Sequence, residues 1–250
     1  MTTLAIDAGN TRVKWGLFDQ SGSLLEHGVC MHAELPNLRL PTAHEAMISN
    51  VAGSAIETQL KRSLINTAKI HWVTSQASAC GVKNGYTKPE TLGTDRWAAL
   101  IAAWNIKHAL CVVVNAGTAV TIDALTGDGE FIGGMILPGL DLMQQSLGLA
   151  TAQLPTLCAP PTLDSSVFAS NTADAIHAGA LHAISGAVNQ MTQALQIHSK
   201  QEPTVIISGG NADAIKEHLT SDVTKQVLIV DNLVLQGLYL LKNFTQSDSR

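Results

Sequence analysis

The chain has 250 residues, of which 46% are hydrophobic and 14% charged, and its formal net charge is −5 at pH 7. This composition is that of an ordinary soluble, folded protein with one large domain or two modest ones, and it excludes an intrinsically disordered chain. The acidic balance argues against a general nucleic-acid binder, which would carry a basic face. We therefore expect any anionic ligand to be held by local donors.

The cysteines predict a reducing compartment, because the four of them are scattered and form no CxxC pair. They are Cys30, Cys80, Cys111 and Cys158. Met1 leads directly into a short apolar run, which leaves no room for a signal peptide, and no stretch has the roughly 18 uncharged apolar residues of a membrane helix. We expect a cytoplasmic protein without a disulfide framework, a zinc site or a membrane segment.

The first motif is a strand–turn–strand unit. An apolar run ends at Asp7, a glycine turn follows, and a second extended run covers Val13–Phe18. The glycine turn exposes backbone N–H groups and allows a phosphate to approach closely. Asp7 is placed to hold Mg²⁺, directly or through water, and Lys14 could reach a β- or γ-phosphate. An ordinary hairpin with an Asx turn would explain the same residues.

The second motif, Gly93-Thr94-Asp95-Arg96, precedes a periodic apolar pattern that predicts a helix over residues 96–106. Thr94 is expected as the N-cap, and Asp95 in the first turn would be stabilised by the helix dipole. The functional alternative is that Asp95 takes the proton from an attacking hydroxyl, while Arg96 binds a substrate carboxylate or carbonyl.

A copy of the first motif follows. The run VVVNAGTA over residues 112–119 repeats the pattern of LAIDAGNT over residues 4–11. Two related phosphate-sized turns suggest a nucleotide held between two α/β lobes. We assign residues 1–110 to the first lobe and residues 111–250 to the second.

The remaining pattern completes the second lobe, with a proline-rich loop predicted over residues 155–161. The predicted helices cover residues 168–198, 212–219 and 233–243, and the predicted strands cover residues 205–207 and 227–230. Between the first of these strands and its helix lies Ser208-Gly209-Gly210-Asn211, where paired glycines would allow a base or ribose to lie against the backbone.

The ordered set of motifs resembles type III pantothenate kinases, members of the acetate and sugar kinase, Hsp70 and actin superfamily. The matching runs are DAGNTRVKWGLFD at 7–19, GYTKPETLGTDRWAALIAAW at 85–104, NAGTAVTID at 115–123, FIGGMILPGL at 131–140, NTADAIHAGAL at 171–181 and ISGGNA at 207–212. The resemblance implies two ribonuclease H-like (actin-like) α/β lobes with a nucleotide cleft between them. It also implies ATP-dependent phosphorylation of pantothenate to 4′-phosphopantothenate, the first step of coenzyme A biosynthesis.

The resemblance assigns site residues as well. ATP would contact Asp7, Ala8, Gly9, Asn10, Thr11, Arg12, Val13, Lys14 and Thr118. Pantothenate would contact Tyr86, Gly93, Thr94, Asp95, Arg96 and Thr172, with Asp95 as the general base. Because the family is dimeric, Thr172 would come from the neighbouring subunit, and the small residues of the long helix that follows it would form the seam.

One position departs from the family pattern. Type III pantothenate kinases commonly have Asp where this chain has Asn115, and that carboxylate helps to bind K⁺ or NH₄⁺. The amide still supplies a neutral oxygen, so we expect a weakened cation site. Two alternatives remain open: an ATP-binding regulatory or accessory protein that has lost turnover, and a phosphohydrolase of the same superfamily that uses water as the acceptor.

Overall fold

The computed structural model describes residues 1–150 and 167–245, with side chains except for those of residues 148–150 and 245. The chain forms two compact units. The first unit contains residues 1–109, 125–133 and the described residues from 232 onward, and the second contains residues 110–124 and 134–231. The first unit's opening segment ends at residue 109, next to the predicted boundary at residue 110. Residues 125–133 and the described residues from 232 onward were predicted in the second lobe, but they belong to the first unit.

The first unit is built on a five-stranded sheet with the order β3-β2-β1-β4-β5, in which β1 runs antiparallel to β2 and parallel to β4. Its strands are β1 (Thr3–Ala8), β2 (Arg12–Phe18), β3 (Leu24–Met31), β4 (Glu45–Asn50) and β5 (Lys69–Trp72). Its helices are α1 (Ser54–Ser63), α2 (Thr94–Lys107) and α7 (Leu233–Thr245), with short 3-10 turns at His32–Asn37 and Pro89–Thr91. The short strands β6 (Ser78–Ala79) and β7 (Val82–Asn84) pair with each other.

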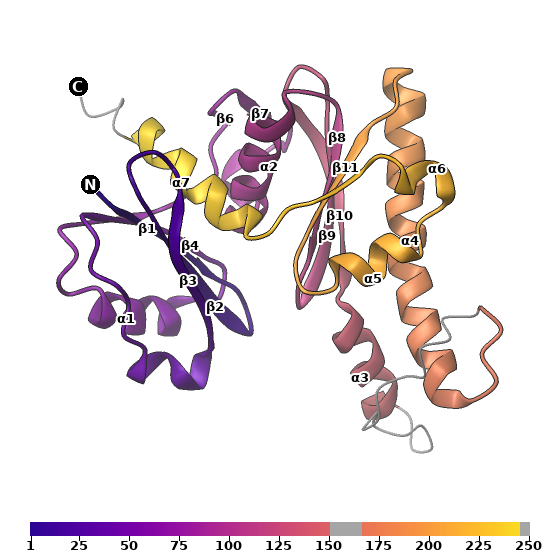
Figure 1. Cartoon of the computed structure of the whole chain (residues 1–250), viewed down its shortest axis with the longest axis horizontal. Helices are drawn as coiled ribbons and strands as arrows, with labels where there is room; N and C mark the ends of the chain where they lie inside the picture. The colour runs from indigo at the N-terminus through magenta and orange to yellow at the C-terminus, as the bar shows by residue number, and fades with distance from the viewer. Residues whose placement is uncertain (151–166, 246–250) are drawn as a thin grey trace. The chain divides into compact units, whose positions relative to one another are not determined.

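Alternation along β1 directs its side chains to two different layers, since successive residues of a strand point to opposite faces. Leu4, Ile6 and Ala8 lie in a core cluster with buried residues of α1. Thr3 faces the other way, because its hydroxyl accepts a hydrogen bond from Lys242 Nζ of α7 at 3.4 Å. Asp7 therefore points to the face that α2 and α7 cover, and Figure 1 shows α1 and α7 on opposite sides of this sheet.

The two helices on that face pack very closely at a glycine. A Cβ atom on Gly237 of α7 would lie 1.8 Å from the carbonyl oxygen of Ala98 in α2. Only glycine allows this approach, which fixes α2 against α7 and thereby against β1 and β4. The N-terminus of α2 is held in place by this contact.

The second unit has the strand order β12-β11-β8-β9-β10, with β11 parallel to both β8 and β12. Its strands are β8 (Cys111–Ala116), β9 (Ala119–Leu125), β11 (Thr204–Ser208) and β12 (Val227–Ile229). It also contains the later part of β10 (Glu130–Pro138), whose residues 130–133 belong to the first unit. Its helices are α3 (Leu140–Ala150), α4 (Thr172–Ser199), α5 (Ala212–Glu217) and α6 (Ser221–Thr224). Apolar side chains of β8, β9 and β11 pack against α4 and α5, which lie along this sheet in Figure 1.

The predicted elements are largely present. Both predicted hairpins form, but the long helix begins at Thr172 and not at residue 168, because the side chain of Asn171 caps it by accepting a hydrogen bond from the Asp174 N–H at 3.0 Å. The helix predicted over 212–219 ends at Glu217. The predicted loop at residues 155–161 and Cys158 lie outside the described residues, within which the other three cysteines are free thiols.

Candidate active site

Three polar side chains meet at the end of β1. Asp7 pairs with Lys14 on β2 and with Ser49 on β4, and residues paired directly across a sheet point to the same face. This is the face that α2 and α7 cover. The predicted Asp7 and Lys14 are thus brought together, and Ser49, which belongs to no predicted motif, joins them.

The N-terminus of α2 is tied to this group. The hydroxyl groups of Ser49 and Thr94 lie 2.8 Å apart and share a hydrogen bond. The prediction that Thr94 is the N-cap is wrong: Gly93 occupies that position, and Thr94 is the first helical residue because its hydroxyl bonds to Ser49 and not to its own helix. Asp95, the next residue, is close enough to Asp7 for its charge to act on that carboxyl.

Burial and charge act together on the Asp7 carboxyl. Its pKa is raised from 3.8 to about 7: removal from water is the largest cause, the negative charge of Asp95 acts in the same direction, and Lys14 opposes them. Its Oδ1 atom is buried and has no hydrogen-bond partner among the described residues. Near neutral pH this carboxyl therefore has both protonated and ionised forms, and a cation beside it would favour the ionised form.

An unpartnered, buried carboxylate oxygen fits a hard cation such as Mg²⁺. Within residues 1–150 and 167–245, no group of three or more His, Cys, Asp or Glu side chains is arranged to hold a metal ion. Asp7 would consequently need ligands from elsewhere, and Mg²⁺ in nucleotide sites usually takes them from water and phosphate oxygens. A single carboxylate of this kind fits a metal that takes its remaining ligands from water and a nucleotide.

The carboxylate of Asp95 folds back onto its own helix. Its Oδ1 accepts a hydrogen bond from the Arg96 N–H at 2.8 Å, and a Cβ atom on Gly93 would lie 2.6 Å from that same oxygen. Glycine at position 93 leaves the space that the carboxylate occupies. The Arg96 side chain is 4% exposed, and its Nη1 donates a hydrogen bond to Tyr86 Oη at 2.8 Å. Residues 93–96 and Tyr86, predicted to bind one substrate, are therefore neighbours.

The predicted phosphate loop is a tight turn between β1 and β2. The Gly9 N–H donates to the Arg12 carbonyl at 3.1 Å, and the ring Nε2 of His32 lies 2.8 Å from the Gly9 carbonyl oxygen. His32 was not predicted, because its distance from the loop in sequence hides the contact. Ala8 and Val13 are fully buried in the sheet, so only their backbone could face a phosphate. Asn10 and Arg12 are exposed.

The second hairpin is built differently. Asn115 on β8 is half-buried and pairs with Ser208 on β11. Thr118 is exposed in the turn, and its carbonyl accepts a hydrogen bond from the Gly139 N–H at 2.8 Å. A Cβ atom on Gly209 would lie 2.3 Å from the Ala116 carbonyl oxygen. Glycine at this position therefore allows the loop that follows β11 to approach the backbone of the hairpin.

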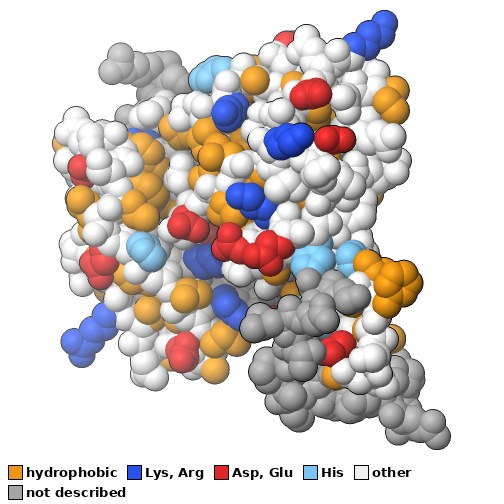
Figure 2. All heavy atoms as spheres, turned by 45° about the vertical axis from the view of Figure 1, so that its right-hand side comes forward, with side chains coloured by type: hydrophobic (Ala, Val, Ile, Leu, Met, Phe, Trp, Pro, Cys, Tyr) orange, Lys and Arg blue, Asp and Glu red, His pale blue; other side chains and the backbone are white. Residues whose placement is uncertain are grey.

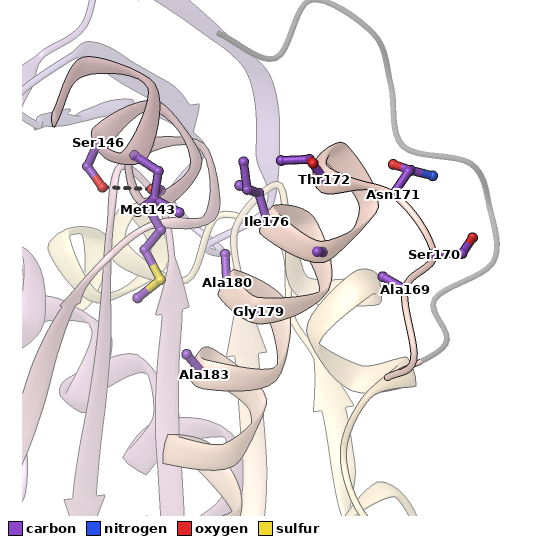
Figure 3. Close-up of a pocket in the computed structure, with 12 residues that line it drawn as sticks. Met143, Ser146, Ala169, Ser170, Asn171, Thr172, Ile176, Gly179, Ala180 and Ala183 are labelled. Atoms are coloured by element: carbon purple, nitrogen blue, oxygen red, sulfur yellow. Dashed lines mark hydrogen bonds between the residues drawn. The ribbon is translucent and has the colours of Figure 1, made fainter. Parts of the chain in front are cut away.

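Thr172 lies at the rim of a pocket between α3 and α4 with a volume of about 780 Å³ (Figure 3). The wall is mainly apolar, and in Figure 3 Ile176, Ala180 and Ala183 follow Thr172 down one side of α4. Thr172 itself is exposed at the first position of the helix. The structure thus places Thr172 in the second unit, whereas the other residues predicted for the same substrate are in the first.

Basic side chains form no continuous patch on the visible face of the described residues. In Figure 2 the Lys and Arg side chains stand apart from one another, with acidic side chains between them.

Within the described part of the chain, no helix is sufficiently long and apolar to cross a membrane.

A family model described as type III pantothenate kinase matches residues 3–194. The chain belongs to the type III pantothenate kinase family. A relative from Nitrosospira multiformis named type III pantothenate kinase is 41% identical over 253 residues, which cover 97% of this chain and 91% of that protein. The family inferred from the ordered motifs is confirmed, and with it the kinase class of enzyme.

Solved structures confirm the fold of this pantothenate kinase family member. A Campylobacter jejuni protein described as a Baf family transcriptional activator has a TM-score of 0.62 at 19% identity, with 97% of this chain and 99% of that chain covered. A Sinorhizobium meliloti protein described as a 2-dehydro-3-deoxygalactonokinase has a TM-score of 0.59 at 13% identity, with 97% and 99% covered. At these identities the likeness concerns the fold alone, which is the predicted actin-like α/β class.

Proposed function

We propose that this chain transfers the γ-phosphoryl group of ATP to the primary hydroxyl of pantothenate, with Asp95 as the general base. The observation that carries the proposal is the juxtaposition in the first unit of Asp95 with the buried Asp7 and with the Arg96–Tyr86 pair. Asp95 thus lies near the carboxyl suited to a metal that accompanies ATP, and the adjacent residue, Arg96, carries a charge suited to an organic anion. Membership of the family supports the choice of substrate.

The chemistry follows from these positions. The hydroxyl oxygen of pantothenate forms a bond to the γ-phosphorus while the bond from that phosphorus to the β–γ bridging oxygen breaks, and ADP leaves. Asp95 accepts the hydroxyl proton. The Arg96 guanidinium binds the pantothenate carboxylate through its planar fork, which orients the acceptor. Lys14 and the polar side chains of Asn10 and Thr11 stabilise the negative charge on the phosphates.

Asp7 would hold Mg²⁺, directly or through water, and the bound metal would supply charge neutralisation at the phosphates. In the second unit, Thr118 would contact the nucleotide and Asn115 would offer a neutral oxygen to K⁺ or NH₄⁺. A neutral ligand binds a monovalent cation less strongly than a carboxylate, which supports a weakened site.

We also propose a homodimer in which Thr172 of one subunit reaches the pantothenate site of the other. The support is the exposed face of α4, where Cβ atoms on Gly179 and Gly186 would meet nothing within 4 Å. Small residues on an exposed helix face permit close approach of a second helix. The cytoplasmic location expected from the scattered cysteines stays a prediction.

An acceptor panel tests the proposal. Purified protein is incubated with ATP, Mg²⁺ and KCl, and ADP formation is followed with pantothenate, with small alcohols and sugars, and without acceptor. We expect turnover with pantothenate far above the other acceptors and little ADP without one. ATP binding without transfer would support the regulatory alternative, and ADP release that is independent of acceptor would support a hydrolase.

A further inference from the structure

The guanidinium group of Arg96 lies against two aromatic rings. Its central carbon is 5.6 Å from the ring centroid of Tyr86 and 5.6 Å from that of Phe131. The two ring centroids are 5.3 Å apart, with planes inclined by 38°. These distances are within the range of cation–π and tilted aromatic interactions, so the three side chains form one contact group.

Phe131 is the anchored member of this group. It lies on β10 and is 0% exposed, whereas Tyr86 is half-buried on the loop that follows β7. Arg96 is 4% exposed, so its charge has little contact with water and depends on its protein neighbours. A fixed ring beside a buried guanidinium restricts the directions in which the fork can point.

The backbone of Phe131 also sets the position of the Tyr86 loop. Phe131 pairs with Asn84 of β7, and its carbonyl accepts a hydrogen bond from the Gly85 N–H at 2.9 Å. A Cβ atom on Gly85 would lie 2.2 Å from that carbonyl oxygen, so the loop is pressed against β10.

Asn84 completes the attachment through its side chain. Its Oδ1 accepts a hydrogen bond from the Tyr86 N–H at 3.1 Å, and its Nδ2 donates to the Pro89 carbonyl at 3.1 Å and to the Gln76 carbonyl at 3.2 Å. The loop that carries Tyr86 is therefore held at its start by Phe131 and across its span by Asn84.

We infer that Phe131 is a positioning residue that orients Arg96, together with Tyr86, toward the carboxylate of the acceptor, with Asn84 as its support. Phe131 acts through Arg96 and contacts no reacting atom. This inference rests on the proposed function and deepens it, because it assigns selection for an acidic acceptor to an aromatic side chain on β10. Misplacing a substrate-orienting group by a fraction of an ångström lowers catalytic efficiency.

The test compares Phe131→Leu with a matched control, Phe18→Leu. Phe18 is also buried and also stacks on a tyrosine, Tyr239, with ring centroids 5.0 Å apart, but it lies at the opposite end of β1 from Asp7. Each protein is assayed with pantothenate and with pantothenyl alcohol, which has a hydroxyl in place of the carboxylate. Thermal unfolding of both variants is measured in parallel.

We expect Phe131→Leu to lower kcat/KM for pantothenate about ten-fold, mainly through KM, with little change for pantothenyl alcohol or in the KM for ATP. Phe18→Leu should leave the ratio of the two acceptors as in the wild type. Asn84→Asp, which keeps the acceptor for the Tyr86 N–H and removes two donors, should shift the ratio in the same direction by a smaller factor.

Equal losses with both acceptors, or the same change of ratio in Phe18→Leu, would overturn the inference and leave the pantothenate kinase function intact. A wild type that phosphorylates neither acceptor would overturn both. If Phe131→Leu does not fold, Phe131→Met, whose longer and more flexible side chain can fill an irregular gap without the ring, gives the same comparison of acceptors.

Discussion

The two hairpins that open the two halves of the chain share a sequence pattern but differ in what surrounds them. In the first, Asp7 is buried between Lys14, Ser49 and the N-terminus of α2, and the charge of Asp95 acts on it. In the second, Asn115 is half-buried beside Ser208. At the position before the turn, the first hairpin thus has an acid and the second an amide, and the second hairpin's own acid, Asp123, is buried farther along β9.

This difference indicates a division of labour between the two turns. A carboxylate kept partly protonated by burial is a responsive ligand, because a cation beside it changes its charge state. An amide does not titrate and binds cations more weakly. Under the proposed function, the first hairpin would govern Mg²⁺ and phosphoryl transfer, and the second would align the nucleotide.

Among changes at the turns of the two hairpins, the largest effect should come from removing the acid of the first hairpin. Asp7→Asn keeps the shape of the side chain but removes the charge, and we expect kcat to fall on the order of 10²-fold because the metal loses its protein ligand. Steady-state assays over a range of Mg²⁺ concentrations measure this. The matched change in the second hairpin, Asn115→Ala, should lower kcat much less. Equal losses of kcat in the two variants would contradict the division of labour between the hairpins.

Asp7 should also control how stability depends on pH. Its folded pKa of about 7 exceeds the ordinary 3.8, so the folded state keeps a proton that the unfolded chain releases, and the free energy of unfolding falls as pH rises between these values. The full difference corresponds to at most about 4 kcal/mol. Asp7→Asn should therefore gain stability relative to the wild type from pH 4.5 to pH 8.

Urea denaturation of both proteins at several pH values measures the effect. Asp95→Asn should show a smaller change of the same sign, because it removes the negative charge that adds to the effect of burial on the pKa of Asp7. Parallel stability curves for the wild type and Asp7→Asn would show that burial of this carboxyl is not costly.

The second hairpin can be made more like the first. Asn115→Asp adds a carboxylate, and we expect the KCl concentration for half-maximal activity to fall about ten-fold, which corresponds to ~1.4 kcal/mol of added attraction. Asn37→Asp, on an exposed turn, serves as the control for added charge. Identical KCl titrations for the wild type and Asn115→Asp would reject a cation site at this position.

The smallest effect concerns the bond that ties α2 to the first hairpin. Ser49→Ala removes the 2.8 Å hydrogen bond to Thr94 in a buried position, which should cost about 1 kcal/mol of stability and lower kcat a few-fold. A double-mutant cycle with Thr94→Val isolates the pair, and a coupling energy near zero would show that the bond does not hold the helix.

The features that the sequence predicted correctly are those that depend on residues close together in the chain. The two hairpins, the helix after Arg96 and the family were predicted because glycine turns and apolar periodicity are visible in short windows. Ser49 and His32 were missed because each reaches the site through pairing or folding over more than twenty residues. Likewise, α7 was expected in the second lobe, yet Gly237 packs it against α2 of the first unit.

The most direct test follows transfer of radiolabelled γ-phosphate from ATP to pantothenate in the wild type, in Asp95→Asn and in Asp222→Asn. Asp222, in the first turn of α6, is an exposed acid that controls for loss of a charge at a helix start. We predict labelled phosphopantothenate from the wild type and Asp222→Asn, and a kcat about 10²–10⁴-fold lower for Asp95→Asn. Unchanged transfer in Asp95→Asn would contradict the assignment of the base.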